Sequence, residues 1–515
     1  MGKVISKAVF KEYDQQQSLL LPPSLDELIG PNHLVRIVNQ VVERLDLSAL
    51  INEYAGGGAS AYHPKMMTKV LLYGYAMKIY TGRKLAKALQ QDITFMWLAA
   101  YNRPDFRTLN LFRSGILKET IEELFKELLL FLVDHGYVKV DDYFTDGTTF
   151  RANANQHKVV WRKNAERYRA IAQEKCQDLF RQIDALNAAE DLQYGDRDLA
   201  EMGSKPVSKE DLHDEVDKLN NAIEKAQEKK KKRKVETLQR RVTEQQGKIA
   251  KYEQQLQVSQ QRSGYSKTDT EATVMMMKNE EFLPAYNVLT SCEQQFITTL
   301  SVHQNPNDGT CLKEHLKNLI FTPRTITADS AFGTEENYQL LEGLEIESYL
   351  KYNTFHREQT PKYKSNIFLK ENFSYDAATD TYSCPREQRL KYTYSRKDIN
   401  PKTGFVSHTR IYEAENCSAC PLRSDCTKSA EGNRMLVVNP QLDAYRKQTR
   451  RNLTSGQGLA LRKRRNHEVE SCFGDIKHNM GFRRFHLRGL KKIKIEATLV
   501  AMAHNLRKLH LTQAA

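Results

Sequence analysis

Apolar residues recur at steps of three and four through most of the first 135 residues, which predicts a series of short helices. The stretch "NHLVRIVNQVVERLDL" carries such a stripe from Leu34 to Leu45, and "MMTKVLLYGYAMKIY" is apolar enough to form a buried helix. "RPDFRTLNLFRSGIL" predicts a further helix with Pro104 near its start, where proline is tolerated. Arginines at helix starts are typical of a DNA-binding bundle, but a helical dimerisation domain would show the same pattern.

The middle of the chain has the shorter apolar runs of β-strands. A β-type segment is predicted from Val138 to Arg151, and "PAYNVLTS" and "QQFITTLSVHQ" predict an antiparallel pair with a turn around Cys292–Glu293. "RTITADSAFGTEENYQLLEGL" predicts a strand, a turn and a helix, and "EIESYLKYN" predicts another strand. Without two insertions this order is β–β–β–α–β–α, which indicates an α/β core with a mixed sheet.

The first insertion, 158–262, has an apolar heptad pattern that predicts a coiled coil. It contains three heptad sets, which begin at Trp161, Leu212 and Val235, and a basic run from Lys229 to Lys234. We interpret it as a long antiparallel helical hairpin with a solvated basic run. A coiled coil between two chains would give the same pattern.

A late helix carries two stripes side by side. Val469, Cys472 and Ile476 form a core-facing stripe, whereas Glu470 and Lys477 belong to a neighbouring stripe with two glycines. A solvated Glu/Lys face is one interpretation of the second stripe, and a functional face is the other. The basic stretch "GFRRFHLRGLKKIKIE" follows, and its two phenylalanines could either pack in the core or stack on bases.

The charge of the chain favours a polyanionic partner. The 515 residues carry a net charge of +14 with a pI of about 9.1. From Arg451 to the end there are 14 Lys and Arg against 4 Asp and Glu. A basic field concentrated in one region favours nucleic acid over a membrane surface. The sequence has no apolar run of 18 residues and no signal-peptide core, so we expect a cytoplasmic protein.

Three acidic residues stand where an α/β core would place a metal site. Asp146 and Asp329 each end a predicted strand, and Glu470 lies on the late helix. Carboxylates gathered beyond strand ends suit Mg²⁺, and two such ions support in-line displacement at phosphorus. Each acid also has a plainer interpretation, because Asp146 could shape a turn with Gly147 and Asp329 could cap a helix. Glu468 competes with Glu470 but lies away from the Lys477 face.

Four of the eight cysteines cluster in a region rich in turn residues. Cys384 is followed by Cys417, Cys420 and Cys426, with one x2 spacing between the second and third. In a reducing compartment four such thiolates suit tetrahedral Zn²⁺, which would stabilise a small insertion with little core. Reduced unliganded thiols and a redox role are the alternatives.

Several of these motifs together resemble bacterial insertion-sequence transposases of the DDE class. The similar stretches span nearly the whole chain: "YHPKMMTKVLLYGYAMKIYTGRKLAKAL", "RPDFRTLNLFR", "TDGTTFRANAN", "ADSAFGTEENY", "CSACPLRSDCT", "EVESCFGDIKHNMGFRRFHLRG" and "AHNLRKL". In related transposases the glutamate helix carries a Tyr, Arg, Glu, Lys signature. Lys477 fits its last step, whereas Arg465 is only the nearest arginine to its expected place and Arg462 stands where the tyrosine would be.

The resemblance implies a ribonuclease-H-like core in which Asp146, Asp329 and Glu470 are catalytic and bind Mg²⁺ or Mn²⁺. It also implies that the chain binds double-stranded DNA, both the element's ends and the target, and that it forms a homodimer in the synaptic complex. The expected location is the bacterial cytoplasm, in association with the nucleoid. The expected DNA contacts are Lys477, Arg465, Arg483, Arg484 and Arg488. The expected activity is metal-dependent strand cleavage and strand transfer. A non-catalytic DNA-binding derivative and a metal-dependent nuclease are the alternatives.

The predicted domains follow from these motifs. They are a helical DNA-binding domain at 1–135, two core segments with the aspartates at 136–157 and 263–358, the coiled-coil insertion at 158–262, the cysteine-rich zinc insertion at 359–440, and the C-terminal core helices with the glutamate and the basic tail at 441–515.

Overall fold

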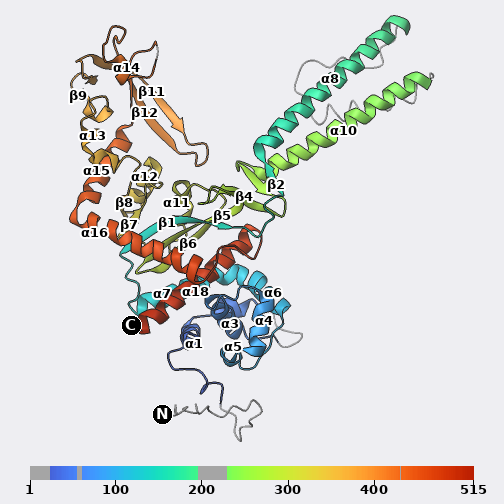
Figure 1. Cartoon of the computed structure of the whole chain (residues 1–515), viewed down its shortest axis with the longest axis vertical. Coiled ribbons are helices and arrows are strands. Elements are labelled where there is room, and N and C mark those ends of the chain that lie inside the picture. The colour runs from blue at the N-terminus through green and yellow to red at the C-terminus, as the bar shows by residue number, and fades with distance from the viewer. Residues whose placement is uncertain (1–23, 55–60, 195–228, 430, 515) are drawn as a thin grey trace, which may run out of the picture.

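The protein consists of a central mixed sheet, a helical region at one end, and two arms that project from the other end (Figure 1). The computed structural model describes residues 24–54, 61–194, 229–429 and 431–514. No helix within these ranges is long and apolar enough to cross a membrane.

The N-terminal region is helical, as predicted. Its elements are α1 (Leu34–Arg44), α2 (Ser48–Asn52), α3 (Pro64–Ala76), α4 (Gly82–Gln91), α5 (Ile93–Leu98), α6 (Phe106–Leu111), the π-helical η1 (Phe112–Ile116) and α7 (Leu117–Asp134). Side chains cap several helix starts: the Asp105 carboxylate accepts a hydrogen bond from the backbone N–H of Thr108, for example. Pro104 therefore precedes this helix rather than lying inside it.

The central sheet is built from β1 (Asp142–Arg151), β2 (Val159–Trp161), β3 (Gly264–Ser266), β4 (Asp269–Met276), β5 (Phe282–Glu293), β6 (Phe296–His303), β7 (Thr325–Ala328) and β8 (Glu347–Leu350). Its main order is β2-β3-β4-β5-β1-β7-β8, and β6 also pairs with β5. β1 is antiparallel to β5 but parallel to β7, which is in turn parallel to β8. The predicted mixed sheet is confirmed.

Helices cover both faces of this sheet. α11 (Asp308–Leu316) and α12 (Glu335–Gly343) pack on one face around a core that includes Tyr143. The other face, which includes Phe144, is covered by one continuous helical stretch, while α15 (Pro440–Thr454) packs beside β8 and contributes residues to the cores on both faces. That stretch comprises α16 (Gly456–Arg465), η4 (Asn466–Glu470), α17 (Ser471–Gly474) and η5 (Asp475–Asn479). Because neighbouring residues of β1 point to opposite faces, its side chains reach both helical layers.

Two predicted strand boundaries are wrong by a few residues. β1 begins at Asp142 rather than Val138, because the buried Glu293 carboxylate binds the backbone N–H groups of residues 139–142. Val140 also has a positive φ of 62°, which breaks the extended backbone. The β5–β6 turn lies at Gln294 and Gln295, both left-handed, and not around Cys292–Glu293.

The first insertion is helical, as predicted. α8 (Arg162–Tyr194) and α10 (Lys229–Ser259) lie side by side as one arm (Figure 1) and bury one shared apolar cluster, which includes Cys176 and Val242. The structure thus supports an intramolecular helical hairpin and does not establish coiled-coil geometry. The predicted heptad set beginning at Leu212 lies outside the described residues.

The second arm is a five-stranded antiparallel sheet in the cysteine-rich region. Its strands are β9 (Ser374–Asp376), β10 (Thr381–Ser383), β11 (Arg389–Ile399), β12 (Val406–Ala414) and β13 (Met435–Val438), in the order β13-β12-β11-β10-β9. Short helices accompany it: η2 (Arg357–Gln359), α13 (Pro361–Lys364), η3 (Lys370–Asn372) and α14 (Arg423–Cys426). The loop after β11 touches the core, where Thr403 donates a hydrogen bond to Glu336 of α12.

The C-terminal helix α18 (Leu490–Ala514) joins the helical region to the sheet. It packs against α3, α7 and β6, and its apolar residues belong to the same core as those of the N-terminal helices. The Tyr80 hydroxyl, which is almost fully buried, donates to the backbone oxygen of Met480 across this junction. The helical region and the sheet therefore share one hydrophobic core.

Candidate active site

Asp146 points from β1 toward the helical stretch formed by α16 to η5. Its carboxylate forms an ion pair of 3.0 Å with Arg465, whose side chain is 10% exposed. Burial raises the pKa of Asp146 to about 6, against the lowering effect of Arg465; the nearby charges of Asp329 and Asp308 add to the rise. Because β1 continues through Gly147 to Arg151, the interpretation of Asp146 as a turn residue is wrong.

Asp329 follows the last residue of β7, the strand parallel to β1. Its side chain accepts a hydrogen bond of 2.9 Å from the backbone N–H of Ala331. It does not cap α12, because the N-cap of that helix is Thr334. Asp329 and Asp146 thus lie near each other at the edge of the sheet where β7 ends and β1 continues.

Glu470 is exposed on the helix that crosses this edge. The two π-helical segments η4 and η5 lie on either side of α17, and Glu470 is the last residue of η4. Each π turn holds an extra residue and so shifts the positions of the side chains that follow, and such bulges are frequent at functional sites. Arg465, five residues earlier, contacts Asp146, and Lys477, seven residues later, contacts Thr148. Along the chain, Glu470 thus lies between two helix residues whose side chains touch the same face of β1.

Glu468 has a structural role that sets it apart from Glu470. It is 8% exposed, and its carboxylate accepts a hydrogen bond of 2.7 Å from the backbone N–H of Gln295. It also lies 3.5 Å from Arg464, which forms an ion pair with Asp142. These contacts fix the helix to the β5–β6 turn and to the start of β1, which gives Glu468 a structural role; Glu470 as the functional glutamate stays a prediction.

Asp308 lies near Asp146 and Asp329, although it was not among the predicted site residues. We call the carboxylates of Asp146, Asp308 and Asp329 the acidic edge. Asp308 is the first residue of α11, on the opposite face of β1 from Asp146, and its carboxyl group lies over the Cα of Gly147. Burial raises its pKa, a hydrogen bond from Asn287 opposes this, and Asp329 raises it further. The only signal in the sequence was the turn-like "NPND" before a helix, which is common at helix starts.

Two buried polar atoms beside the acids lack hydrogen-bond partners. Thr290 lies directly across from Asp146 in the β1–β5 pair, and its hydroxyl is buried and unpaired. The side-chain oxygen of Asn287, which neighbours Asp308, is also buried and unpaired. Buried polar atoms are seldom left unpaired, so water or a ligand would be bound at each atom. The two atoms lie on opposite faces of β5, the Thr290 hydroxyl on the side of Asp146 and the Asn287 oxygen on the side of Asp308. The oxygen-rich surroundings suit a hard cation.

Within the described ranges, no three His, Cys, Asp or Glu side chains are arranged so that they could hold a metal ion. The three predicted acids are accordingly not gathered around one point. Arg465 forms an ion pair with Asp146, and Glu470 contacts neither aspartate. Ligation by all three acids would require these side chains to move.

The same finding goes against the predicted zinc site. Cys384, Cys417, Cys420 and Cys426 do lie in one region, since burial and the other three thiols together raise the pKa of Cys426. Backbone N–H groups donate hydrogen bonds to two of the sulfur atoms, those of Cys384 and Cys417. The region also has its own apolar core, so the premise that it needs a metal for lack of a core is wrong.

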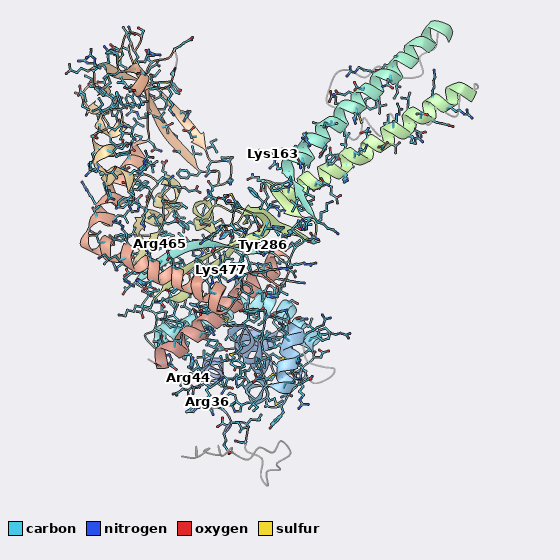
Figure 2. All side chains as sticks on the ribbon, viewed as in Figure 1. Arg36, Arg44, Lys163, Tyr286, Arg465 and Lys477 are labelled. Carbon is cyan, nitrogen blue, oxygen red and sulfur yellow. The ribbon has the colours of Figure 1, made fainter. Side chains whose placement is uncertain are left out.

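The predicted DNA-contacting residues fall into two groups. Arg465 and Lys477 lie along the helix next to the sheet (Figure 2), and Lys477 donates to both Thr148 and Thr149. The second group is exposed after this helix: Arg484 and Arg488 donate to Asn153, and Arg483 donates to the backbone oxygen of Lys477. Of the two interpretations of Phe482 and Phe485, core packing is confirmed, since each is 1% exposed.

Comparison with known protein families identifies two domains. A family described as "Transposase domain (DUF772)" matches residues 23–115, which cover the N-terminal helices up to η1. A family described as "Transposase DDE domain" matches residues 383–510, which include the helix with Glu470 and most of α18. No curated protein matches the chain. A DDE transposase domain implies a ribonuclease-H-like fold, with which the mixed sheet agrees.

Proposed function

We propose, on the premise that the chain is an insertion-sequence transposase of the DDE type, that it binds the terminal inverted repeats of its own element and catalyses DNA cleavage and strand transfer. One observation carries this proposal: Asp146 within β1 and Asp329 just after the parallel strand β7 lie near each other, and the helix that bears Glu470 contacts Asp146 through Arg465. DNA is the substrate expected of the family, and the basic C-terminal region suits it.

Asp146, Asp329 and Glu470 would hold Mg²⁺ or Mn²⁺, because carboxylate oxygens are the ligands that these cations prefer. Bound divalent cations would supply an activated water or 3′-hydroxyl and stabilise the leaving oxygen. The chain's own contribution is to hold the carboxylates on rigid elements: a strand, a short loop and a bulged helix. Arg465 neutralises Asp146 in the absence of a cation, and when it is released from that ion pair it is free to bind a DNA phosphate.

The remaining basic residues would position the DNA on either side of this centre. Lys477 contacts the strand that carries Asp146, so a phosphate bound by Lys477 would lie close to the acids. Arg483, Arg484 and Arg488 are exposed around Asn153, shortly after β1 ends. We assign the N-terminal helices to recognition of the repeat, and we expect a homodimer in the synaptic complex, since two DNA ends must meet.

The experiment is strand cleavage of a duplex carrying the element's own end, with wild type and Asp329→Asn compared in Mg²⁺ and in EDTA. We expect cleavage that needs the cation and falls by at least about a hundredfold in the variant, because a metal ligand is lost. Asp134→Asn, an exposed position at the end of α7, is the matched control and should cleave as wild type does.

Other outcomes would favour one of the alternatives. Equal binding of the ends without cleavage by either protein would indicate a non-catalytic DNA-binding derivative. Metal-dependent cutting that ignores the end sequence and yields no joined product would indicate a nuclease. Cleavage that persists in EDTA would contradict the metal-dependent mechanism.

A further inference from the structure

Lys351 lies beside the acidic edge, at the carboxyl end of the next strand. It follows the last residue of β8, and its backbone N–H donates to the backbone oxygen of Ala328, the residue before Asp329. β1, β7 and β8 are neighbouring parallel strands, and they present Asp146, Asp329 and Lys351 in this order. The carboxyl ends of parallel strands are where open α/β sheets bind their ligands.

Lys351 is half-buried and has no acidic partner. No carboxylate lies within 4.0 Å of its ammonium group among the ion pairs of the described residues. Burial lowers the pKa of Lys351, Arg465 and Arg462 lower it further, and Asp329 has the opposite effect. A cation held in this way is usually compensated by a ligand or by water, because burying a charge without a partner is costly.

Two further basic side chains lie close enough to Lys351 for their charges to act on one another. The Arg462 guanidinium lies 5.0 Å from the centre of the Phe355 ring and donates to the backbone oxygen of Leu453, while its Nε is buried without a partner. His356 is exposed, and its pKa is lowered by burial and by the charges of Lys351 and Arg462. We call Lys351, His356 and Arg462 the basic shelf.

The basic shelf differs from the other cations around the acids. Arg464 and Arg465 are paired with Asp142 and Asp146, and so are already neutralised. The basic shelf has donors without an anion, next to the place where a phosphodiester would be cut. An ordinary solvated lysine would extend into water, whereas Lys351 is partly enclosed at the sheet edge.

We propose that Lys351 and Arg462 bind a backbone phosphate of the DNA strand that is being cut, one that adjoins the scissile phosphate. This inference rests on the proposed function and adds a binding subsite to it. The phosphate would supply the anion that the basic shelf lacks, and the contact would hold the DNA strand across the carboxyl ends of β7 and β8, beside Asp146 of β1.

The test is DNA binding by the full chain in EDTA, where cleavage cannot interfere. We compare wild type, Lys351→Ala and Lys317→Ala by fluorescence anisotropy with a duplex carrying the element's end, over a range of salt concentrations. Lys317 lies just beyond α11, at the end opposite Asp308, is 61% exposed, and provides the matched loss of one charge. We expect Lys351→Ala to bind about tenfold more weakly, with a salt slope lower by about 1, and Lys317→Ala to bind as wild type does.

A neutral methylphosphonate placed at single positions of the strand then locates the contact. Replacing the phosphate next to the cleavage site should weaken wild type but not weaken Lys351→Ala further. Additive losses at every position, or unchanged binding by Lys351→Ala, would overturn the proposal. Circular dichroism establishes that the variant is folded, and Lys351→Gln serves if Lys351→Ala is not.

This experiment separates the two proposals. Asp329→Asn should bind DNA in EDTA as tightly as wild type, so loss of cleavage with normal binding tests the mechanism alone. Loss of binding in Lys351→Ala alone tests the basic shelf. If wild type binds the element's end no more tightly than unrelated DNA, that result contradicts the proposed function and also the phosphate subsite that rests on it.

Discussion

Gly147 has no side chain, and this allows the carboxyl group of Asp308 to approach β1 closely. It lies in β1 next to Asp146, and the carboxyl group of Asp308 occupies the space where a Cβ would stand. In the sequence, Asp146–Gly147 could be taken for a turn, because glycine after aspartate is a common turn signal. The structure gives this glycine another role, that of admitting a second carboxyl group close to the strand.

Replacing Gly147 with alanine tests this role. The added Cβ would stand 2.4 Å from Cγ of Asp308, so the buried Asp308 side chain or the start of α11 must shift. We expect a loss of about 1–3 kcal/mol in the free energy of unfolding, as for overpacked cores, together with reduced cleavage. Chemical denaturation and the cleavage assay measure the two effects.

Gly247 provides the control for this prediction. It lies inside α10, and no atom of a neighbouring residue lies within 4 Å of the place that a Cβ would take. Gly247→Ala should therefore stabilise the arm by up to about 1 kcal/mol, since alanine favours a helix more than glycine does. Equal stability changes in the two variants would show that Gly147 is not needed for close packing.

The helical arm shows what periodicity can predict at the scale of an element. The heptad spacing predicted the helices α8 and α10, because one apolar stripe must be buried in any packing arrangement. It could not distinguish a partner in the same chain from one in a second chain. In the structure, apolar residues of the two helices, such as Leu179 and Leu238, share a cluster within one chain.

Removing the arm tests whether it folds independently of the core. Trp161 and Gly264 are paired across β2 and β3, so the two ends to be rejoined are already adjacent. We expect a variant with a short turn in place of residues 162–262 to keep cooperative unfolding and near wild-type core stability, since a short loop costs little entropy. Circular dichroism during heating measures this, and light scattering of both proteins with the DNA ends shows whether each forms the homodimer that we propose.

Loss of cooperative unfolding in the shortened protein would mean that the arm supports the sheet. Loss of the DNA-bound dimer alone would instead assign dimerisation to the arm, which is the alternative that the heptads left open.

At the scale of the whole molecule, the sequence predicted the order of elements better than the contacts between them. The strand and helix order of the core could be inferred from periodicity, and Asp329 from its place after a strand. The role of Asp308 could not, because only the fold brings α11 against Gly147. The basic shelf was equally hidden, since Lys351 and Arg462 are far apart in the sequence and meet only where α16 crosses the sheet.

The predicted domain at 1–135 stays a prediction, but part of its packing is visible in the described residues. Apolar residues of α1, α3 and α7 pack in one core with those of α18 and with residues of β5 and β6. Composition marks where one kind of element gives way to another, but it does not show which surfaces are buried against each other.

We propose that Asp146, Asp329 and Glu470, which are far apart in the sequence, surround one cation site. The most direct measurement replaces Mg²⁺ with Fe²⁺, which binds such ligands at least as well. Added hydrogen peroxide is reduced by the bound Fe²⁺ to hydroxyl radicals, which cut the backbone near the ion, and ascorbate regenerates Fe²⁺. We expect protein fragments that end near residues 146, 329 and 470, with all three lost in Asp146→Asn and retained in Asp134→Asn. Cuts near the two aspartates without any near residue 470, or no cuts at these places, would contradict the claim.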